Sequence, residues 1–306
     1  MARYLAARLG YSLITFWVIV TLVFFLMRLA PGGPFDGERR LPPEVEANLN
    51  AAYNLDKPLA QQYVDYLSML LSGDLGPSFR QKDFTVNELV VSGLPVSLTI
   101  GGLALLFAVL AGVSAGLTAG LRPGSRADIV VMGVTNIGIA MPTIIVAPLA
   151  ILLFSVTLNW LPAGGIGSWR HYVLPPLALC LPFAAAIARL TRGSVAETLS
   201  EPHVRTARSK GLPMHRIVRR HILPIALLPV LSYLGPAAAA LLTGSVVVEQ
   251  VFDLPGIGRY FVQGALNRDY TLVMGVVVVY AGMILLFNLL VDSTYARLDP
   301  RIRLSG

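Results

Sequence analysis

The sequence predicts an all-α, polytopic membrane protein with six transmembrane helices, and two observations lead to this prediction. Hydrophobic residues make up 55% of the 306 residues and charged residues only 13%, whereas soluble proteins carry about 25% charged residues. A helix needs about 20 apolar residues to cross the hydrocarbon core of a bilayer. Six stretches meet that requirement, at about residues 9–29, 96–121, 129–158, 172–190, 223–248 and 272–291.

The first stretch is interpreted as an uncleaved anchor, and the basic residues predict its orientation. Its apolar run continues to Met27, which is longer than the roughly 7 to 15 apolar residues of a signal peptide. Cytoplasmic loops of membrane proteins are enriched in Lys and Arg. If the N-terminus is cytoplasmic, most of the 24 Lys and Arg lie in the termini and the cytoplasmic loops. We therefore expect both termini in the cytoplasm.

The long segment between the first two spans is expected to form a small helical insertion outside the membrane. Residues 41–53 have Pro at the helix start and acids in the first turn, and a second helix is predicted between an Asp56 cap and Gly73. Thr85 and Glu88 have the spacing of a capping box. The predicted organisation is an N-terminal end with the first span at 1–30, an extracytoplasmic helical insertion at 31–95, and a core with five spans at 96–306, which includes a cytoplasmic loop at 191–222.

Small residues recur every four positions along the second span. A spacing of four places them on one helix face, where another helix backbone can approach closely. Part of this ridge, "GVSAG", matches the Gly-x-Ser-x-Gly nucleophile motif, but that motif requires a turn from strand to helix. We therefore favour helix packing over catalysis. The ridge consists of Ala104, Ala108, Gly112, Gly116 and Gly120.

No motif for catalysis, nucleotide binding or metal binding occurs in the sequence. It lacks a Gly-x-x-x-x-Gly-Lys-Ser/Thr phosphate loop and a His-Glu-x-x-His pair, and Cys180 has no second cysteine to pair with. The alternative is a proton- or ion-coupled secondary transporter, which would be expected to hold acids or broken helices near the midplane. Glu249 and Asp292 fall only at helix ends. Five prolines are expected to interrupt helices, at Pro142, Pro148, Pro182, Pro229 and Pro236.

The most basic part of the chain is residues 204–224, which carry six Arg or Lys, two His and no acid. Gly211 is expected to end one short helix and Pro213 to begin another. Attraction to anionic lipid would explain the charge, because each basic residue near a membrane surface contributes about 1 kcal/mol. Attraction to lipid would not explain why Gly and Pro occur between the two predicted helices.

This loop resembles the cytoplasmic loop of ABC importer permeases. Their pattern is Glu-Ala-Ala, three residues, Gly, nine residues, then Ile-x-Leu-Pro, and "RTARSKGL" is similar to the variant of the dipeptide and oligopeptide permeases. The matching positions are Ala207, Gly211, Leu223 and Pro224, and the departures are Arg205, Thr206 and His221. "RLAPGGPFDGERRLPPEV", "GDLGPSF", "PVLSYLGPA", "VVVEQVFDLPGIGRYFVQGALNRDY" and "DPRIR" resemble the B-type permeases of that subfamily in order along the chain.

The resemblance implies a type I ABC importer permease fold and a role as the transmembrane subunit of an ATP-driven peptide importer in the bacterial inner membrane. It implies a second homologous permease subunit, two ATPase subunits that bind ATP and Mg, an extracytoplasmic peptide-binding protein and a peptide substrate. This chain would contact lipid bilayer and no nucleic acid, and would hold no cofactor of its own. The coupling residues implied are Arg205, Thr206, Ala207, Arg208, Lys210, Gly211, Leu212 and Pro213.

The segment before the last span is too apolar for a solvated loop. We expect a structured element at the outer mouth, in which Pro, Gly and Gly permit a tight turn. A gate and a static plug both fit this expectation. The candidate outer-gate residues are Phe252, Leu254, Pro255, Gly256, Ile257 and Gly258.

Overall fold

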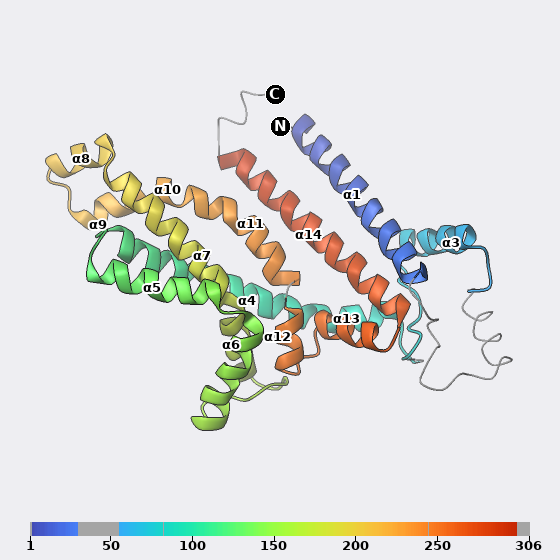
Figure 1. Cartoon of the computed structure of the whole chain (residues 1–306). Coiled ribbons are helices and arrows are strands. Elements are labelled where there is room, and N and C mark those ends of the chain that lie inside the picture. The colour runs from blue at the N-terminus through green and yellow to red at the C-terminus, as the bar shows by residue number, and fades with distance from the viewer. Residues whose placement is uncertain (1, 30–54, 82, 244, 299–306) are drawn as a thin grey trace.

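The computed structural model describes residues 2–29, 55–81, 83–243 and 245–298, and every regular element in these residues is a helix (Figure 1). The helix expected at 41–53 lies outside the described residues. Five helices of the described chain are long and apolar enough to cross a membrane. They include α1 (Ala2–Leu29), α4 (Val86–Gly120), α7 (Leu174–Leu199), α11 (Leu228–Thr243) and α14 (Tyr270–Leu298).

The stretch expected as a single span at 129–158 is instead bent. The helix α5 (Arg126–Ala140) is followed by α6 (Thr143–Ala150) and the π-helix η1 (Ile151–Thr157), and the two halves meet at 105°. Pro142 stands at the bend as the extended N-cap of α6, where its missing N–H and fixed φ prevent helix continuation. Counting the bent pair as one span gives six.

The other prolines do not break spans in this way, which corrects the expectation that all five interrupt helices. Pro148, Pro182 and Pro236 lie inside α6, α7 and α11. Pro229 is the second residue of α11, where a helix tolerates proline because its first N–H groups have no intrahelical partner.

The small-residue ridge of α4 packs against α7. Ala104 and Ala108 have no exposed surface. A Cβ added at Gly112 would lie 2.7 Å from the carbonyl oxygen of Ala184, and one at Gly116 would collide with the carbonyl oxygen of Ala188. The glycines therefore let two helix backbones approach more closely than any side chain would allow. Gly120, the last residue of the ridge, packs equally closely, since an added Cβ would lie 2.8 Å from Val195 Cβ of α7.

The described part of the insertion contains α3 (Leu59–Leu71), which lies beside one end of α1 (Figure 1) and shares a buried cluster with residues of α1 and α14. Its N-cap is Pro58 rather than the expected Asp56, and no side chain caps it. Gly73 follows the helix with a left-handed φ of 79°, as expected for a residue that ends a helix. The capping box of α4 is confirmed, since the Thr85 hydroxyl accepts from the Glu88 N–H and Glu88 accepts from the Thr85 N–H.

The chain from α7 to α14 is built from shorter helices. After α7 come α8 (Pro202–Ser209), α9 (Met214–Ile217), the π-helix η3 (Val218–Ile222) and α10 (Leu223–Ala226), which leads into α11. Beyond α11 lie α12 (Val246–Val251) and α13 (Ile257–Leu266), and the short η2 (Trp169–Tyr172) precedes α7.

Candidate functional site

Residues 202–217 form a knob of two short helices, α8 and α9, beyond the end of α7 (Figure 1). Gly211 adopts a left-handed φ of 74°, which glycine reaches without steric cost. The Leu212 N–H donates to the Ala207 carbonyl at 3.3 Å and the Gly211 N–H to the Arg208 carbonyl at 2.9 Å. These two bonds form a Schellman motif, and Pro213 then caps α9 in an extended conformation. The corner at Gly211, where α8 turns into α9, is thus fixed by backbone hydrogen bonds.

The knob has one apolar face, which packs on its own chain. Val204, Ala207 and Ile217 are buried in a cluster with Val195 of α7 and Ile222. Ala207 is only 3% exposed, so its small size serves packing within the chain. The expected coupling residue Ala207 therefore packs within its own chain and is not on the exposed surface of the knob.

The opposite face of the knob is basic and exposed. Arg205, Arg208 and Lys210 form no ion pair with any residue that the structure describes. No acid follows Glu201 within the knob, so the cations repel one another and no opposite charge offsets them. The other expected coupling residues on this surface are Thr206, Gly211 and Pro213, which are exposed, and Leu212, which is half-buried.

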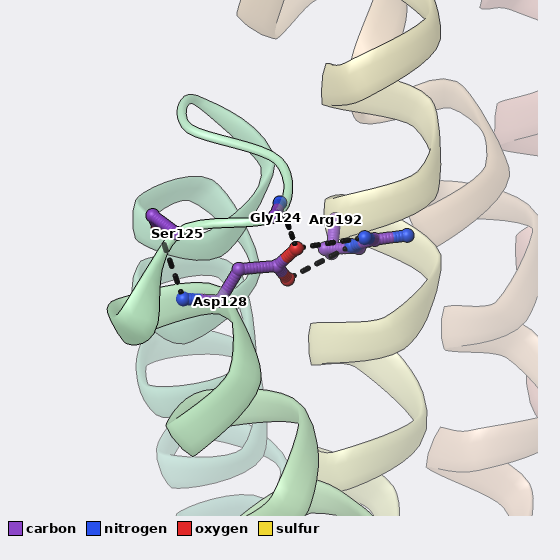
Figure 2. Close-up of polar contacts among 4 residues, drawn as sticks. All are labelled: Gly124, Ser125, Asp128 and Arg192. Carbon is purple, nitrogen blue, oxygen red and sulfur yellow. Dashed lines mark hydrogen bonds and ion pairs between the residues drawn. The ribbon is translucent and has the colours of Figure 1, made fainter.

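An ion pair joins the start of α5 to Arg192 of α7, which precedes the knob by nearly three helical turns (about 3.6 residues each). The Asp128 carboxylate accepts from Arg192 Nε at 3.0 Å and from Arg192 Nη2 at 2.8 Å, and also from the Gly124 N–H at 2.9 Å (Figure 2). Ser125 caps α5 by accepting from the Asp128 N–H. Paired donors from one guanidinium fix orientation as well as distance. The loop between α4 and α5 is therefore held to the helix that carries the knob.

A second element, the plug, comprises residues 252–266 and lies against the other half of α4. Phe252, Leu254 and Ile257 have at most 1% of their surface exposed. A Cβ added to Gly93 of α4 would lie 3.0 Å from the Ile257 backbone nitrogen. The plug is therefore a packed element rather than a free loop, and Pro255 is its half-buried corner.

A buried carboxylate fixes the plug in place. Glu249 has no exposed surface, and it accepts hydrogen bonds from Ser97 Oγ at 2.6 Å, from Ser245 Oγ, from the Gly258 N–H at 2.8 Å and from the Arg259 N–H at 3.2 Å. The two N–H groups belong to the first turn of α13, where a helix dipole favours negative charge. A charge that would be costly to bury alone is thus stabilised by four donors.

The glycines of the plug provide room for this carboxylate rather than a turn. A Cβ on Gly256 would collide with the Glu249 carboxylate, and one on Gly258 would lie 2.6 Å from Val246 Cα. Neither glycine has a left-handed φ; that conformation belongs to Asp253, with φ of 51°. The expectation of a tight turn at Pro255, Gly256 and Gly258 is therefore corrected to one of close packing.

A similar carboxylate at the N-terminus of α14 was not anticipated. Asp269 is 1% exposed and accepts from Ser78 Oγ, from the Phe79 N–H at 3.1 Å and from the Leu272 N–H at 3.1 Å. It joins the segment after α3 to the last span. The signal available in the sequence was an Asp directly before the apolar helix that begins at Tyr270, which is a common N-cap position.

The knob and the plug lie at opposite ends of α4. Gly93 contacts the plug, whereas Leu117 packs against the buried cluster of the knob. At a rise of about 1.5 Å per residue, these positions are roughly 36 Å apart along the helix. This separation exceeds the thickness of the hydrocarbon core of a bilayer, which is about 30 Å.

Known proteins similar to this chain are membrane components of transporters. The family model described as "Binding-protein-dependent transport system inner membrane component" matches residues 108–304. The oligopeptide transport system permease protein OppB of Salmonella typhimurium is 50% identical over 99% of this chain and 100% of its own length. The dipeptide transport system permease protein DppB of Bacillus subtilis is 42% identical over 99% of both chains.

Solved structures with this fold include the MetNI methionine ABC transporter in an inward-facing conformation. That chain is 22% identical, with a TM-score of 0.54, and the match covers 69% of this chain and 96% of the other. A second match is an amino acid ABC transporter, at 21% identity and a TM-score of 0.54. These likenesses establish the shared helical fold.

Proposed function

We propose, from the premise that this chain belongs to the family of binding-protein-dependent transport system inner membrane components, that it forms half of the translocation pathway of an oligopeptide and dipeptide importer. It is a permease component and not an ATPase. The other half of the pathway would be a second homologous permease. Two ATPase subunits would bind ATP and Mg, and an extracytoplasmic peptide-binding protein would deliver the peptide.

The observation that carries the proposal is that the knob has one buried apolar face and one exposed basic face. Its buried face ties α8 and α9 to α7, while its exposed face carries Arg205, Arg208 and Lys210 without an acidic partner in the described chain. A rigid corner with an unpaired cationic surface fits a partner that supplies both a groove and acids. We assign that surface to the ATPase subunits.

Movement of the knob would be transmitted along α7 and across to α5. Arg192 lies on α7 before the knob, and its paired bonds to Asp128 couple the two helices. The closely packed ridge between α4 and α7 leaves little room for one to slide alone. A displacement imposed by ATPase closure would therefore move α4, α5 and α7 as a unit.

The plug would act as the outer gate of this pathway. It lies at the end of α4 remote from the knob, so a rigid displacement of α4 would reach it directly. Phe252, Leu254 and Ile257 would then provide the apolar seal, held by Glu249. Impermeant thiol reagents applied to single cysteines in residues 252–266 test this role, because a gate changes reactivity with nucleotide state and a static plug does not.

Peptide uptake by a strain that lacks only this subunit tests the transport function. We expect uptake to be lost and to return when the chain is supplied. The purified chain should bring two ATPase subunits with it and should hydrolyse no nucleotide alone. Proton-dependent uptake by the chain alone would instead favour a secondary transporter.

The orientation that this function requires has both termini and the knob in the cytoplasm of a multi-pass inner membrane protein. Single cysteines at Lys210 in the knob and at the exposed Leu266 in the plug should react with an impermeant reagent from opposite sides. Reaction of Lys210→Cys in intact cells would contradict this orientation.

A further inference from the structure

The bend between α5 and α6 interrupts a membrane span near its middle. The helix α5 ends at Ala140, α6 begins at Thr143, and the two halves of the span meet at 105° (Figure 1). The bend, here called the elbow, comprises residues 138–143. An added Cβ at Gly138 would lie 3.3 Å from Ala185 Cβ, and Ala185 stands near the middle of the membrane-crossing helix α7. The elbow therefore lies well inside the membrane.

The backbone of the elbow leaves three carbonyl groups without a hydrogen bond. In an unbroken helix the Gly138 carbonyl would accept from residue 142, which is proline and has no N–H. Neither this carbonyl nor those of Ile139 and Ala140 accept a hydrogen bond from any residue that the structure describes. Irregular backbone at membrane depth is tolerated only where it is buried in protein or lines a water-filled cavity. The elbow therefore does not face lipid.

A polar side chain lies on α5 one turn before its end. Asn136 is exposed, and its amide forms no hydrogen bond with any residue of the described chain. It shares one helix face with Gly133, three residues before it, and with Ala140, four residues after it, and both are also exposed. An added Cβ at Gly133 meets no atom within 4 Å. The space beside the Asn136 amide is therefore open within this chain.

A second exposed face of α5 is entirely apolar. It consists of Val130, Val134 and Ile137, which are 63%, 65% and 59% exposed. Successive residues of a helix are about 100° apart, so Val134 and Asn136 point about 160° away from each other. Lipid suits the apolar face, whereas a polar side chain inside the membrane faces protein or a water-filled cavity. The two faces of α5 therefore meet different surroundings.

We propose that the elbow lines the peptide pathway and that Asn136 binds the main chain of the transported peptide. This inference rests on the proposed function of peptide import. An Asn side chain carries both N–H donors and a carbonyl acceptor, so it pairs with both groups of a peptide unit. The free carbonyls of the elbow accept from further N–H groups of the peptide. Because peptide side chains take no part in these bonds, peptides of different sequence are held in the same way.

The first experiment measures which face of α5 meets water. The buried native cysteine is removed by Cys180→Ala, and single cysteines are introduced as Asn136→Cys and Val134→Cys. The complex with its ATPase subunits is placed in lipid nanodiscs and treated with a membrane-impermeant thiol reagent. A thiol reacts as its thiolate, which forms in water and not in lipid. We expect Asn136→Cys to react about tenfold faster than Val134→Cys, and a transported peptide to slow the reaction.

The second experiment measures the contact between Asn136 and the peptide. The single cysteine Gly133→Cys, on the same face of α5, serves as a reporter, and the readout is the peptide concentration that halves its reaction rate. Asn136→Leu removes the amide and keeps a similar volume, and its matched control is Val134→Leu on the apolar face. We expect Asn136→Leu to raise that concentration about two- to tenfold, as for lost neutral hydrogen bonds, and by a similar factor for peptides with different side chains. Val134→Leu should leave it unchanged.

Three results would overturn the proposal. Equal reaction rates of Asn136→Cys and Val134→Cys would show that the face with the amide lines no water-filled path. Peptide that slows neither Asn136→Cys nor the reporter would show that the elbow meets water but no peptide. An effect of Asn136→Leu on peptides of one sequence only would assign the contact to a peptide side chain. Co-purification of the ATPase subunits checks that each variant is assembled. Absence of peptide uptake by the unmodified complex would instead contradict the proposed function.

Discussion

The knob and the plug handle buried and exposed charge in opposite ways. The knob presents Arg205, Arg208 and Lys210 to the outside and pairs none of them with the described chain. The plug packs around a single buried carboxylate, Glu249, which accepts two hydrogen bonds from the plug and two from Ser97 and Ser245 of the same chain. The cations of the knob can be paired only by acids of a partner, whereas the carboxylate at the plug is already hydrogen-bonded within the chain. Substitutions in the plug should therefore affect the folded chain itself, and those in the knob should affect assembly.

The largest effect is expected at the centre of the plug. Glu249→Ala would leave the hydroxyls of Ser97 and Ser245 and two N–H groups of α13 without an acceptor. Each buried group left unpaired costs about 1 to 3 kcal/mol, so we expect a loss of about 4 kcal/mol in the free energy of unfolding. The measurement is thermal unfolding of the purified complex.

The control for that substitution is Glu88→Gln. Glu88 also accepts from a backbone N–H at a helix start, but on the protein surface, and glutamine can take the same place in a capping box. We expect no change in unfolding temperature. If Glu249→Ala were as mild as this control, the carboxylate would not be holding the plug.

A slightly smaller loss of stability is expected from a substitution in α4 where this helix packs against α7. Gly116→Leu would place a side chain against the Ala188 carbonyl and Thr191 of α7, and overpacking of this kind costs about 3 kcal/mol. Gly102→Leu on the same helix is the matched control, because an added Cβ there meets no atom within 4 Å. Normal assembly and transport by Gly116→Leu would contradict close packing of α4 on α7.

The sequence predicts the helices well because apolar length and capping are local properties. The capping box at Thr85 and Glu88 and the corner at Gly211 follow from residue types a few positions apart. Pro142 likewise predicts a helix break from its residue type alone. The angle of 105° between the two helices that it separates depends on the neighbouring elements against which they pack. The sequence of this stretch therefore could not predict the angle.

The roles that were missed depend on contacts distant in sequence. Glu249 is recognisable as a polar residue at a helix end, but its partner Ser97 lies 152 positions away. Ala207 matches the family pattern, yet only the packing of Val204 and Ile217 shows that it faces inward. Amphipathicity of α8 could have indicated this, since Val204 and Ala207 are three residues apart on one face.

A substitution at Gly211, between α8 and α9, tests how much the shape of the knob contributes to ATPase binding independently of its charge. Gly211 has a left-handed φ of 74°, and a β-branched residue there is strained by about 2 kcal/mol. We expect Gly211→Val to abolish peptide uptake and to release the ATPases, although an added Cβ meets no neighbouring atom within 4 Å. The measurement pairs uptake with ATPase co-purification.

The matched comparison is Gly124→Val. Gly124 also has a left-handed φ, of 78°, and open space around it, but it lies in the loop between α4 and α5. A loss of ATPase contact that is equal in both variants would point to general strain rather than to the knob. Ala207→Trp is not informative here, because Ala207 is buried and the tryptophan would disrupt the knob from within.

The smallest effect is expected from removing one charge of the knob while keeping its shape. Lys210 is exposed and follows α8 directly, and an exposed ion pair with a partner acid would contribute only about 0.2 to 1 kcal/mol. Lys210→Gln should therefore reduce ATPase retention less than about fivefold and leave uptake close to normal. Such a contact is screened by salt, so the difference between Lys210→Gln and the unmodified chain should shrink as ionic strength rises. If the knob were instead held to anionic lipid by charge alone, Lys210→Gln would be more harmful than Gly211→Val, and the order of the two variants in the uptake assay decides between these readings.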